Sequence, residues 1–281
     1  MAKSLHLANK IPTILALSAL TLFVAAYLPV FQILFKKWVS SEEYNHAFLT
    51  LPIIIYMIWV KRFQLVERQV QYSPFGLFIV VLATLAYYFA MLTQVHTIIT
   101  LSMFLTILGV LIYLAGVNSI KELFTPLLLL LILIPIPDQL YIKLTFPLQL
   151  KVSQASEVIV TILGVPLYRE GNIMNIPEKS FEVVEACSGL RSIIALLTLS
   201  LIMGYFMLKK KYAKVILFIA SIPTAIAVNI VRVTVMILLF HFFRIDLTKG
   251  ILHNVTGLMV FGIALITLFT LLKVLKIWET K

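Results

Sequence analysis

The amino-acid sequence predicts an all-α, polytopic membrane protein with about eight transmembrane helices, and three observations lead to this fold class. First, 61% of the 281 residues are hydrophobic and 12% are charged, whereas water-soluble domains average about 45–50% and about 25%. Second, apolar runs long enough to cross roughly 30 Å of hydrocarbon recur along the chain. Third, Lys and Arg are distributed unevenly among the polar breaks. The net charge of +11 is therefore interpreted as membrane topology, and nucleic acid is not an expected partner.

Apolar runs divide the chain into eight expected spans within a single membrane domain, 1–281. They cover residues 11–35, 47–60, 75–95, 97–117, 123–137, 190–208, 215–243 and 251–275. The second and fifth are short, which requires tilt or local thinning of the bilayer. The first follows a basic start but is too long for a cleaved signal peptide, so it is expected to remain as a helix. Spans 1–5 thus fall within 1–137, and spans 6–8 within 190–275.

The charged residues indicate which side of the membrane each break faces. If both termini are cytoplasmic, the inner breaks hold 13 basic and 3 acidic residues, and the outer breaks hold 9 of each. Excess positive charge marks the cytoplasmic side. The charge left over, Arg232, lies inside the seventh span. We therefore expect a multi-pass protein of the cytoplasmic (inner) membrane, with residues 138–189 on its outer face.

The outer segment, 138–189, has two expected parts. Apolar residues repeat at near-helical spacing from Tyr141 to Leu163, which predicts an amphipathic surface helix. Its expected apolar stripe is Leu144, Leu148, Val152, Ala155, Ile159 and Leu163. Residues 167–186 alternate and carry turn signals at 170–172 and 176–178, which predicts a small extended hairpin. That hairpin leads directly into Cys187 and the sixth span.

Three residues on the outer side carry the candidate chemistry. Cys187, the single cysteine, precedes the sixth span, where a helix N-terminus can lower a thiol's pKa and stabilise an oxyanion. Arg232 lies within a span, where a charge is costly without a partner or a wet cavity. His253 begins the eighth span and is followed by Asn254. A thiol, an imidazole and a cation are the equipment of thiol acyl transfer.

Each residue also has a structural interpretation. A lone cysteine is commonly a small buried hydrophobe, and a histidine at a helix start is commonly a cap or a contact. One cysteine forms no intramolecular disulfide, and the five scattered histidines form no H-E-x-x-H pair, so no metal or other cofactor is expected. The expected topology places Cys187, Arg232 and His253 on the same side of the membrane. Because three unrelated structural residues would not be expected to gather there, a shared functional role is favoured.

The residues around these positions resemble the exosortase/archaeosortase family, membrane-embedded cysteine transpeptidases. The resemblance is densest over 180–270. It rests on Glu185-Ala186-Cys187-Ser188-Gly189-Leu190-Arg191-Ser192, Asn229-Ile230-Val231-Arg232-Val233 and His253-Asn254-Val255-Thr256-Gly257. A weaker match is Tyr44-Asn45-His46-Ala47-Phe48-Leu49, with Ala47 where the family usually has Gly.

The resemblance implies an activity and a substrate. Such a protein acts on secreted proteins with a C-terminal tail made of a short motif such as Pro-Glu-Pro, a transmembrane helix and a basic cluster. Cleavage passes through an acyl-thioester at Cys187, followed by transfer to an acceptor or by hydrolysis. Arg232 and His253 carry over as the other catalytic positions.

The division of roles between these two stays open. Arg is effectively always protonated, which favours His253 as acid and base and Arg232 as anion stabiliser; the family's usual assignment is the reverse. Four further residues are expected to support the site: Glu185, Ser188, Asn229 and Asn254. Two of them also have plain structural interpretations. Glu185 orients His253 or receives a basic part of the substrate, or is a solvated carboxylate. Asn229, one turn from Arg232, fixes the guanidinium or makes a helix contact.

Two rival functions use the same residues differently. An intramembrane serine protease would use Ser188, but no Gly-x-Ser-x-Gly segment surrounds it, and the neighbouring thiol is the better nucleophile near neutral pH. A transporter or exopolysaccharide-assembly subunit would use Arg232 to hold an anionic substrate. Paired broken helices in inverted repeats would favour the transporter, and the sequence shows none.

Overall fold

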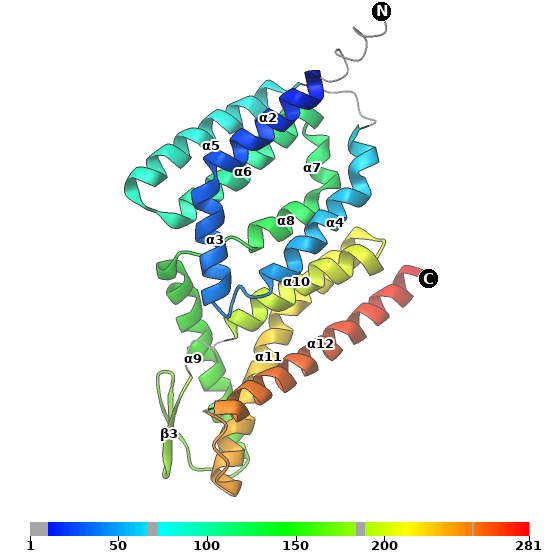
Figure 1. The fold of residues 1–281 in the computed structure, drawn as a ribbon. Helices are drawn as coiled ribbons and strands as arrows, with labels where there is room; N and C mark the ends of the chain where they lie inside the picture. The colour runs from blue at the N-terminus through cyan, green and yellow to red at the C-terminus, as the bar shows by residue number, and fades with distance from the viewer. Residues whose placement is uncertain (1–10, 67–71, 184–188, 249, 281) are drawn as a thin grey trace, which may run out of the picture. The chain divides into compact units, whose positions relative to one another are not determined.

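The fold is taken from a computed structural model that describes residues 11–66, 72–183, 189–248 and 250–280. Helices make up most of these residues (Figure 1). The chain divides into two compact units, Met1–Pro135 and Ile136–Lys281, each described by itself below.

Within the described residues, five helices are long and apolar enough to cross a membrane. They are Pro74–Thr93, His96–Ala115, Leu190–Met207, Lys211–Phe243 and Val255–Glu279, and a bent pair, Leu17–Ala26 with Leu28–Ser40, makes up to six. The chain is therefore a multi-pass, all-α membrane protein, as predicted. The predicted count of eight spans is not confirmed.

The first expected span is broken in the structure. Helices α2 (Ile11–Ala26) and α3 (Leu28–Ser40) meet at Tyr27 and are bent by 59°. Pro29 lies in the first turn of α3, where its missing N–H costs nothing, whereas it cannot continue a helix that arrives from before it. The prediction of one continuous helix over 11–35 was wrong at this position.

The fifth expected span, 123–137, is also shorter than predicted. Helix α8 (Phe124–Ile132) has 9 residues, about 14 Å of axis against about 30 Å of hydrocarbon. It follows the short helix α7 (Asn118–Glu122). Pro135 and Pro137 lie just beyond its end, and the restriction that proline places on the residue before it accounts for the early stop.

The remaining helices of the first unit begin close to the expected positions. They are α4 (Ala47–Val66), α5 (Pro74–Thr93) and α6 (His96–Ala115), of which only α5 and α6 are among the five candidate spans. The backbones of α5 and α6 approach closely at Gly76: a methyl group there would collide with the backbone of Tyr113 and lie 2.7 Å from the carbonyl oxygen of Gly109. Small residues at such contacts are how helices associate where lipid supplies no hydrophobic drive.

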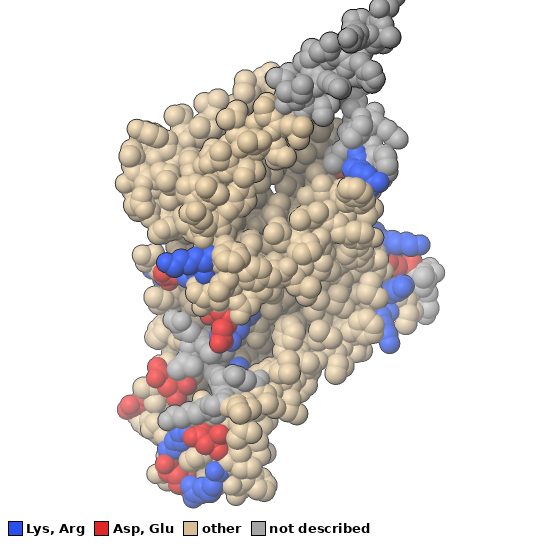
Figure 2. Space-filling view, viewed as in Figure 1, with Lys and Arg blue, Asp and Glu red and all other residues tan. Residues whose placement is uncertain are grey.

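Three long helices dominate the second unit: α10 (Leu190–Met207), α11 (Lys211–Phe243) and α12 (Gly250–Thr280). Short connections make them antiparallel neighbours. At one end, the Glu279 carboxylate of α12 accepts hydrogen bonds from the backbone N–H groups of Lys209 and Lys210, at 3.0 and 2.7 Å. The opposite end of the unit therefore holds the N-termini of α10 and α12 and the C-terminus of α11. Figure 2 shows broad surfaces without charged side chains between the charged groups of this unit.

Helix α9 (Asp138–Ile162) lies where the amphipathic helix was predicted, but it buries a different face. Buried are Thr145, Gln149, Val152, Ser153, Ser156 and Val160, whereas Leu144, Ile159 and Leu163 of the expected stripe are exposed. The small residues pack against α11, and the Ser156 hydroxyl donates to the carbonyl of Ile230 at 3.4 Å. The face of α9 that is buried therefore carries mainly small and polar residues, and much of the apolar stripe stays exposed.

The predicted hairpin forms and has a third strand. Strands β1 (Tyr168–Glu170), β2 (Ile173–Ile176) and β3 (Lys179–Glu182) pair antiparallel in the order β1-β2-β3. Gly171, at φ +63, occupies the tight turn between β1 and β2, a conformation that glycine adopts without strain. The inward side chains Met174, Ile176 and Phe181 join a core with Val233 and Ile237 of α11, which fixes the sheet on the α11 surface.

Candidate functional site

The described part of the site is built around two polar residues of α11. Asn229 and Arg232 lie one helical turn apart, on the same face of the helix. Asn229 is buried, with 2% of its surface exposed, and Arg232 is half-buried. Polar groups at such a place in a membrane helix bundle are costly unless the surrounding groups accommodate them.

Asn229 lies against the start of α10. Gly189 forms the N-cap of α10 with φ +89, and a methyl group on it would lie 3.6 Å from both Cβ and Nδ2 of Asn229. The positive φ favours glycine, whereas the space itself would admit a methyl group in ordinary contact with Asn229. Gly189 follows Cys187 by two residues in the sequence.

Arg232 lies against the start of α12. A methyl group on Gly257 would be 3.6 Å from Nη2, 3.8 Å from Cζ and 3.9 Å from Nη1 of Arg232. The guanidinium therefore packs on the bare backbone of α12. In the sequence, Gly257 follows His253 by four residues, about one turn of α12. The α11 pair thus contacts both neighbouring helices near their N-terminal ends.

Several predicted site residues cannot be added to this geometry. Glu185, Cys187 and Ser188 lie outside the described residues. His253 and Asn254 belong to the first turns of α12, and their side chains lie outside the description. The structure therefore brings together Asn229, Arg232 and the glycines of the two other motifs.

A polar link missed by the sequence reasoning ties the sheet to the connection between α11 and α12. The Lys179 ammonium of β3 donates to Oδ2 of Asp246 at 2.6 Å and to the Thr248 hydroxyl at 3.0 Å. The same Lys179 Nζ lies 5.0 Å from the ring centroids of Phe181 and Phe240. The strand that leads toward Cys187 is thereby held against the loop that leads toward His253.

Asp246 is the centre of this link. Besides Lys179, its carboxylate accepts from the hydroxyl and the backbone N–H of Thr248, at 2.6 and 2.9 Å. The hydrogen bonds from Lys179 and Thr248 hold the pKa of Asp246 well below its usual range. A second ion pair, Arg244 with Glu178 at 3.0 Å, joins the same two segments. The Asp-x-Thr spacing is a recognisable turn signal, but its Lys partner is distant in the sequence.

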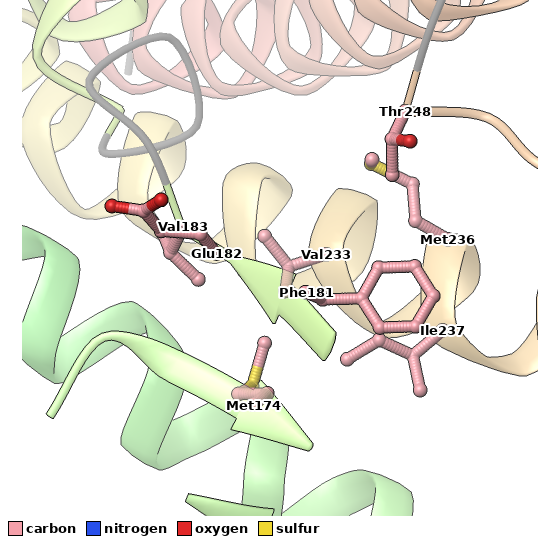
Figure 3. A pocket seen from close by; sticks show the side chains of 8 residues that line it. All are labelled: Met174, Phe181, Glu182, Val183, Val233, Met236, Ile237 and Thr248. Atoms are coloured by element: carbon pink, nitrogen blue, oxygen red, sulfur yellow. The ribbon is translucent and has the colours of Figure 1, made fainter. Parts of the chain in front are cut away.

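Between the sheet and α11 lies a small pocket of about 20 Å³. Figure 3 shows its lining: Met174, Phe181, Glu182, Val183, Val233, Met236, Ile237 and Thr248. Six of these eight residues are apolar, and the Glu182 carboxylate points away from the gathered apolar side chains in the view shown. In the described part of the chain, no three His, Cys, Asp or Glu residues are grouped as metal ligands would be.

Comparison with known protein families decides the relationship. The family model described as transmembrane exosortase matches residues 38–270, most of the chain. The chain belongs to the transmembrane exosortase family. This confirms the resemblance seen in the sequence, and the matched range contains the α11 pair, Gly189 and Gly257 of this exosortase-family protein. No curated protein and no solved structure matches the chain in the same comparison.

Proposed function

We propose that this exosortase-family protein is a membrane-embedded cysteine transpeptidase or protease that uses Cys187, Arg232 and His253. The observation that carries the proposal is the position of the Asn229–Arg232 pair. Its two members contact Gly189, two residues after Cys187, and Gly257, one turn after His253. The three motifs therefore converge through residues that the structure describes, which favours one shared site.

The chemistry proceeds through a thioester. Sγ of Cys187, deprotonated by His253, attacks the carbonyl carbon of the scissile peptide bond, and negative charge develops on the carbonyl oxygen. When the C–N bond breaks, His253 gives that proton to the leaving amine. A nucleophilic acceptor, either water or a hydroxyl or amine of another molecule, then loses its proton to His253 and attacks the thioester. The C–S bond breaks, and the thiol regains the proton.

Arg232 serves this reaction as the stabiliser of the developing oxyanion. Its guanidinium presents several fixed N–H donors and does not give up its proton near neutral pH. Asn229 orients Arg232, and Asn254 and Glu185 support His253. Two helix N-termini, those of α10 and α12, also direct partial positive charge toward this end of the unit, where an anion is favoured.

The proposed substrate is a secreted protein held in the membrane by a C-terminal tail of recognition motif, apolar helix and basic cluster. A polytopic enzyme meets such a tail within the bilayer. Because the distribution of Lys and Arg favours cytoplasmic termini, the reaction is proposed to take place at the outer face of the cytoplasmic membrane. The product is released from its tail by hydrolysis or joined to the acceptor.

Replacing Cys187 tests the proposal. In cells, Cys187→Ala is expected to leave the tailed substrate uncleaved while the enzyme accumulates normally. Losing a thiol that only fills space costs a fold about 1 kcal/mol, whereas losing the nucleophile removes the acyl intermediate altogether. Ser188→Ala is the matched control and should retain cleavage. Normal processing by Cys187→Ala would favour a transporter or assembly role for Arg232, and loss in Ser188→Ala alone would identify a serine enzyme.

A further inference from the structure

We infer that the second unit binds an anionic phospholipid where the connection between α10 and α11 meets the end of α12. The binding groups belong to a lysine cluster, which consists of Lys209, Lys210, Lys211, Lys214, Lys273 and Lys276. None of these residues belongs to the candidate active site, so the lipid site is independent of the proposed chemistry.

Glu279 brings the two segments of the lysine cluster together. Both of its carboxylate oxygens accept hydrogen bonds from backbone N–H groups, at 3.0 Å from Lys209 and 2.7 Å from Lys210. The end of α12 is therefore fixed beside the start of α11. Lys276 lies one turn before Glu279 on the same face of α12, and Figure 2 shows basic side chains beside the C-terminal end of this helix.

The lysine cluster carries a large excess of positive charge. Glu279 is the one acidic residue in the sequence of 205–214 and 273–280, against six lysines. Five of the six lysine side chains are exposed, and Lys214 is half-buried. Long side chains at the end of a membrane helix place their charge at the level of the lipid headgroups. The ammonium groups therefore favour an anion at that level.

Apolar surface continues directly from the lysine cluster. Exposed apolar side chains follow on both helices, namely Val215, Ile216 and Ile219 on α11 and Ile266, Phe269 and Val274 on α12. Tyr212 and Trp278 are also exposed, by 47% and 61%, and such aromatic residues are typical of the membrane–water interface. A phospholipid presents its phosphate directly beside acyl chains, so it contacts the lysines and the apolar surface together. An acidic soluble protein would contact the lysines alone.

The charge of the headgroup is expected to determine which lipid binds. Lys holds a phosphate as a point charge, without the fixed two-pronged geometry that Arg supplies. Each Lys near an anionic membrane surface favours association by roughly fivefold. Phosphatidylglycerol, with a net negative headgroup, should therefore be enriched at the cluster over phosphatidylcholine, whose headgroup has no net charge.

Quenching of Trp278 fluorescence by brominated lipids tests the inference. The full-length protein is placed in phosphatidylcholine vesicles that contain the same mole fraction of either brominated phosphatidylglycerol or brominated phosphatidylcholine. The difference between each protein and its Trp278→Phe counterpart gives the signal of Trp278. Brominated phosphatidylglycerol should be enriched at Trp278 by roughly threefold or more. Equal quenching by the two lipids would overturn the inference.

Matched double variants show whether the lysine cluster causes the enrichment. Lys210→Gln with Lys276→Gln should lower it by roughly threefold or more, and Arg at the same two positions should retain it. Lys143→Gln with Lys151→Gln removes the same charge from exposed positions of α9 and should leave the enrichment unchanged. Unchanged enrichment in the first Gln variant, or an equal loss in the α9 control, would show that the cluster is not the lipid site.

A measurement on the wild-type protein keeps the inference testable if the Gln variant does not fold. Raising the salt concentration screens interactions between exposed charges. The preference for brominated phosphatidylglycerol should therefore fall toward that of phosphatidylcholine as salt is added. A preference that is the same in low and high salt would rule out binding by the lysine ammonium groups.

Discussion

The contact between Gly257 and Arg232 gives a graded prediction. We consider two substitutions at Gly257. Alanine adds a single carbon, which would lie 3.6–3.9 Å from three atoms of the guanidinium, an ordinary van der Waals separation. Because Ala also favours a helix over Gly by about 1 kcal/mol, Gly257→Ala should fold at least as well as wild type. Its cleavage rate should stay within a few-fold of the wild-type rate.

Leucine at the same position should behave differently. Its branched end is larger than the space left beside the guanidinium by a Cβ at that position, so we expect Arg232 to be displaced by about 1 Å. A misplacement of that size in a catalytic group costs about 100-fold in rate. Gly257→Leu should therefore accumulate in the membrane but lose roughly two orders of magnitude in cleavage of the tailed substrate.

Gly262 provides the matched control on the same helix. A methyl group at Gly262 meets no atom within 4 Å, so Gly262→Leu should cleave at a near wild-type rate. The assay measures the initial cleavage rate of a purified tailed substrate in detergent, together with the thermal midpoint of each variant. Equal rates for Gly257→Leu and Gly262→Leu would refute the role given to the Arg232 position.

Three other predictions follow from the same geometry. Arg232→Lys should abolish cleavage with little effect on membrane insertion, because Lys keeps the charge but loses the planar set of donors; near wild-type cleavage in the Lys variant would argue against oxyanion stabilisation. In a Cys187→Ala background, an impermeant maleimide should label Ser180→Cys and not Lys210→Cys in intact cells, and the reverse labelling would overturn the topology. Asp246→Asn should lower the free energy of unfolding by about 1 kcal/mol or less, since the Asp246 side chain keeps 38% of its surface exposed. The pKa of Asp246 is lower in the folded protein than its ordinary value of about 4. The ionised carboxylate therefore stabilises the fold above about pH 4, and this stabilisation is lost as the pH falls through the folded-state pKa. The difference in unfolding free energy between wild type and Asp246→Asn should therefore be constant from about pH 5 to 8 and shrink in stronger acid. A difference that does not change with pH would exclude the ionised Lys179–Asp246 link.

Much of the second unit could be predicted from the sequence. The three Lys residues at 209–211 separate two apolar runs, and the structure turns there between α10 and α11. Alternation and turn residues located the sheet to within a few residues. These features depend on local sequence, because a break in an apolar run or a two-residue turn is determined by the residues that form it.

Features that depend on tertiary contacts could not be predicted. The apolar stripe of α9 indicated which residues are apolar but not whether they face protein or lipid, and in a membrane the two surroundings are almost equally apolar. The Lys179–Asp246 link joins two segments that no local pattern connects. The break at Tyr27 had a local signal in Pro29, but a proline inside an apolar run is also compatible with a kinked span.

The two glycines of the flanking motifs explain why three separate sequence patterns act as one structural unit. Gly189 is the last residue of the Cys-Ser-Gly pattern, and Asn229 packs against it. Gly257 is the last residue of the pattern that begins at His253, and Arg232 packs against it. Both contacts require space close to a helix backbone, which a side chain larger than a methyl group would fill. The polar pair of α11 can be accommodated among apolar helices because each neighbour offers bare backbone at the matching level. Cys187 precedes Gly189 by two residues, and His253 precedes Gly257 by four. These short spacings limit how far each proposed reactive residue can lie from the α11 pair. A side chain larger than a methyl group at either glycine should accordingly affect cleavage through Asn229 or Arg232, even though neither glycine has a reactive group of its own.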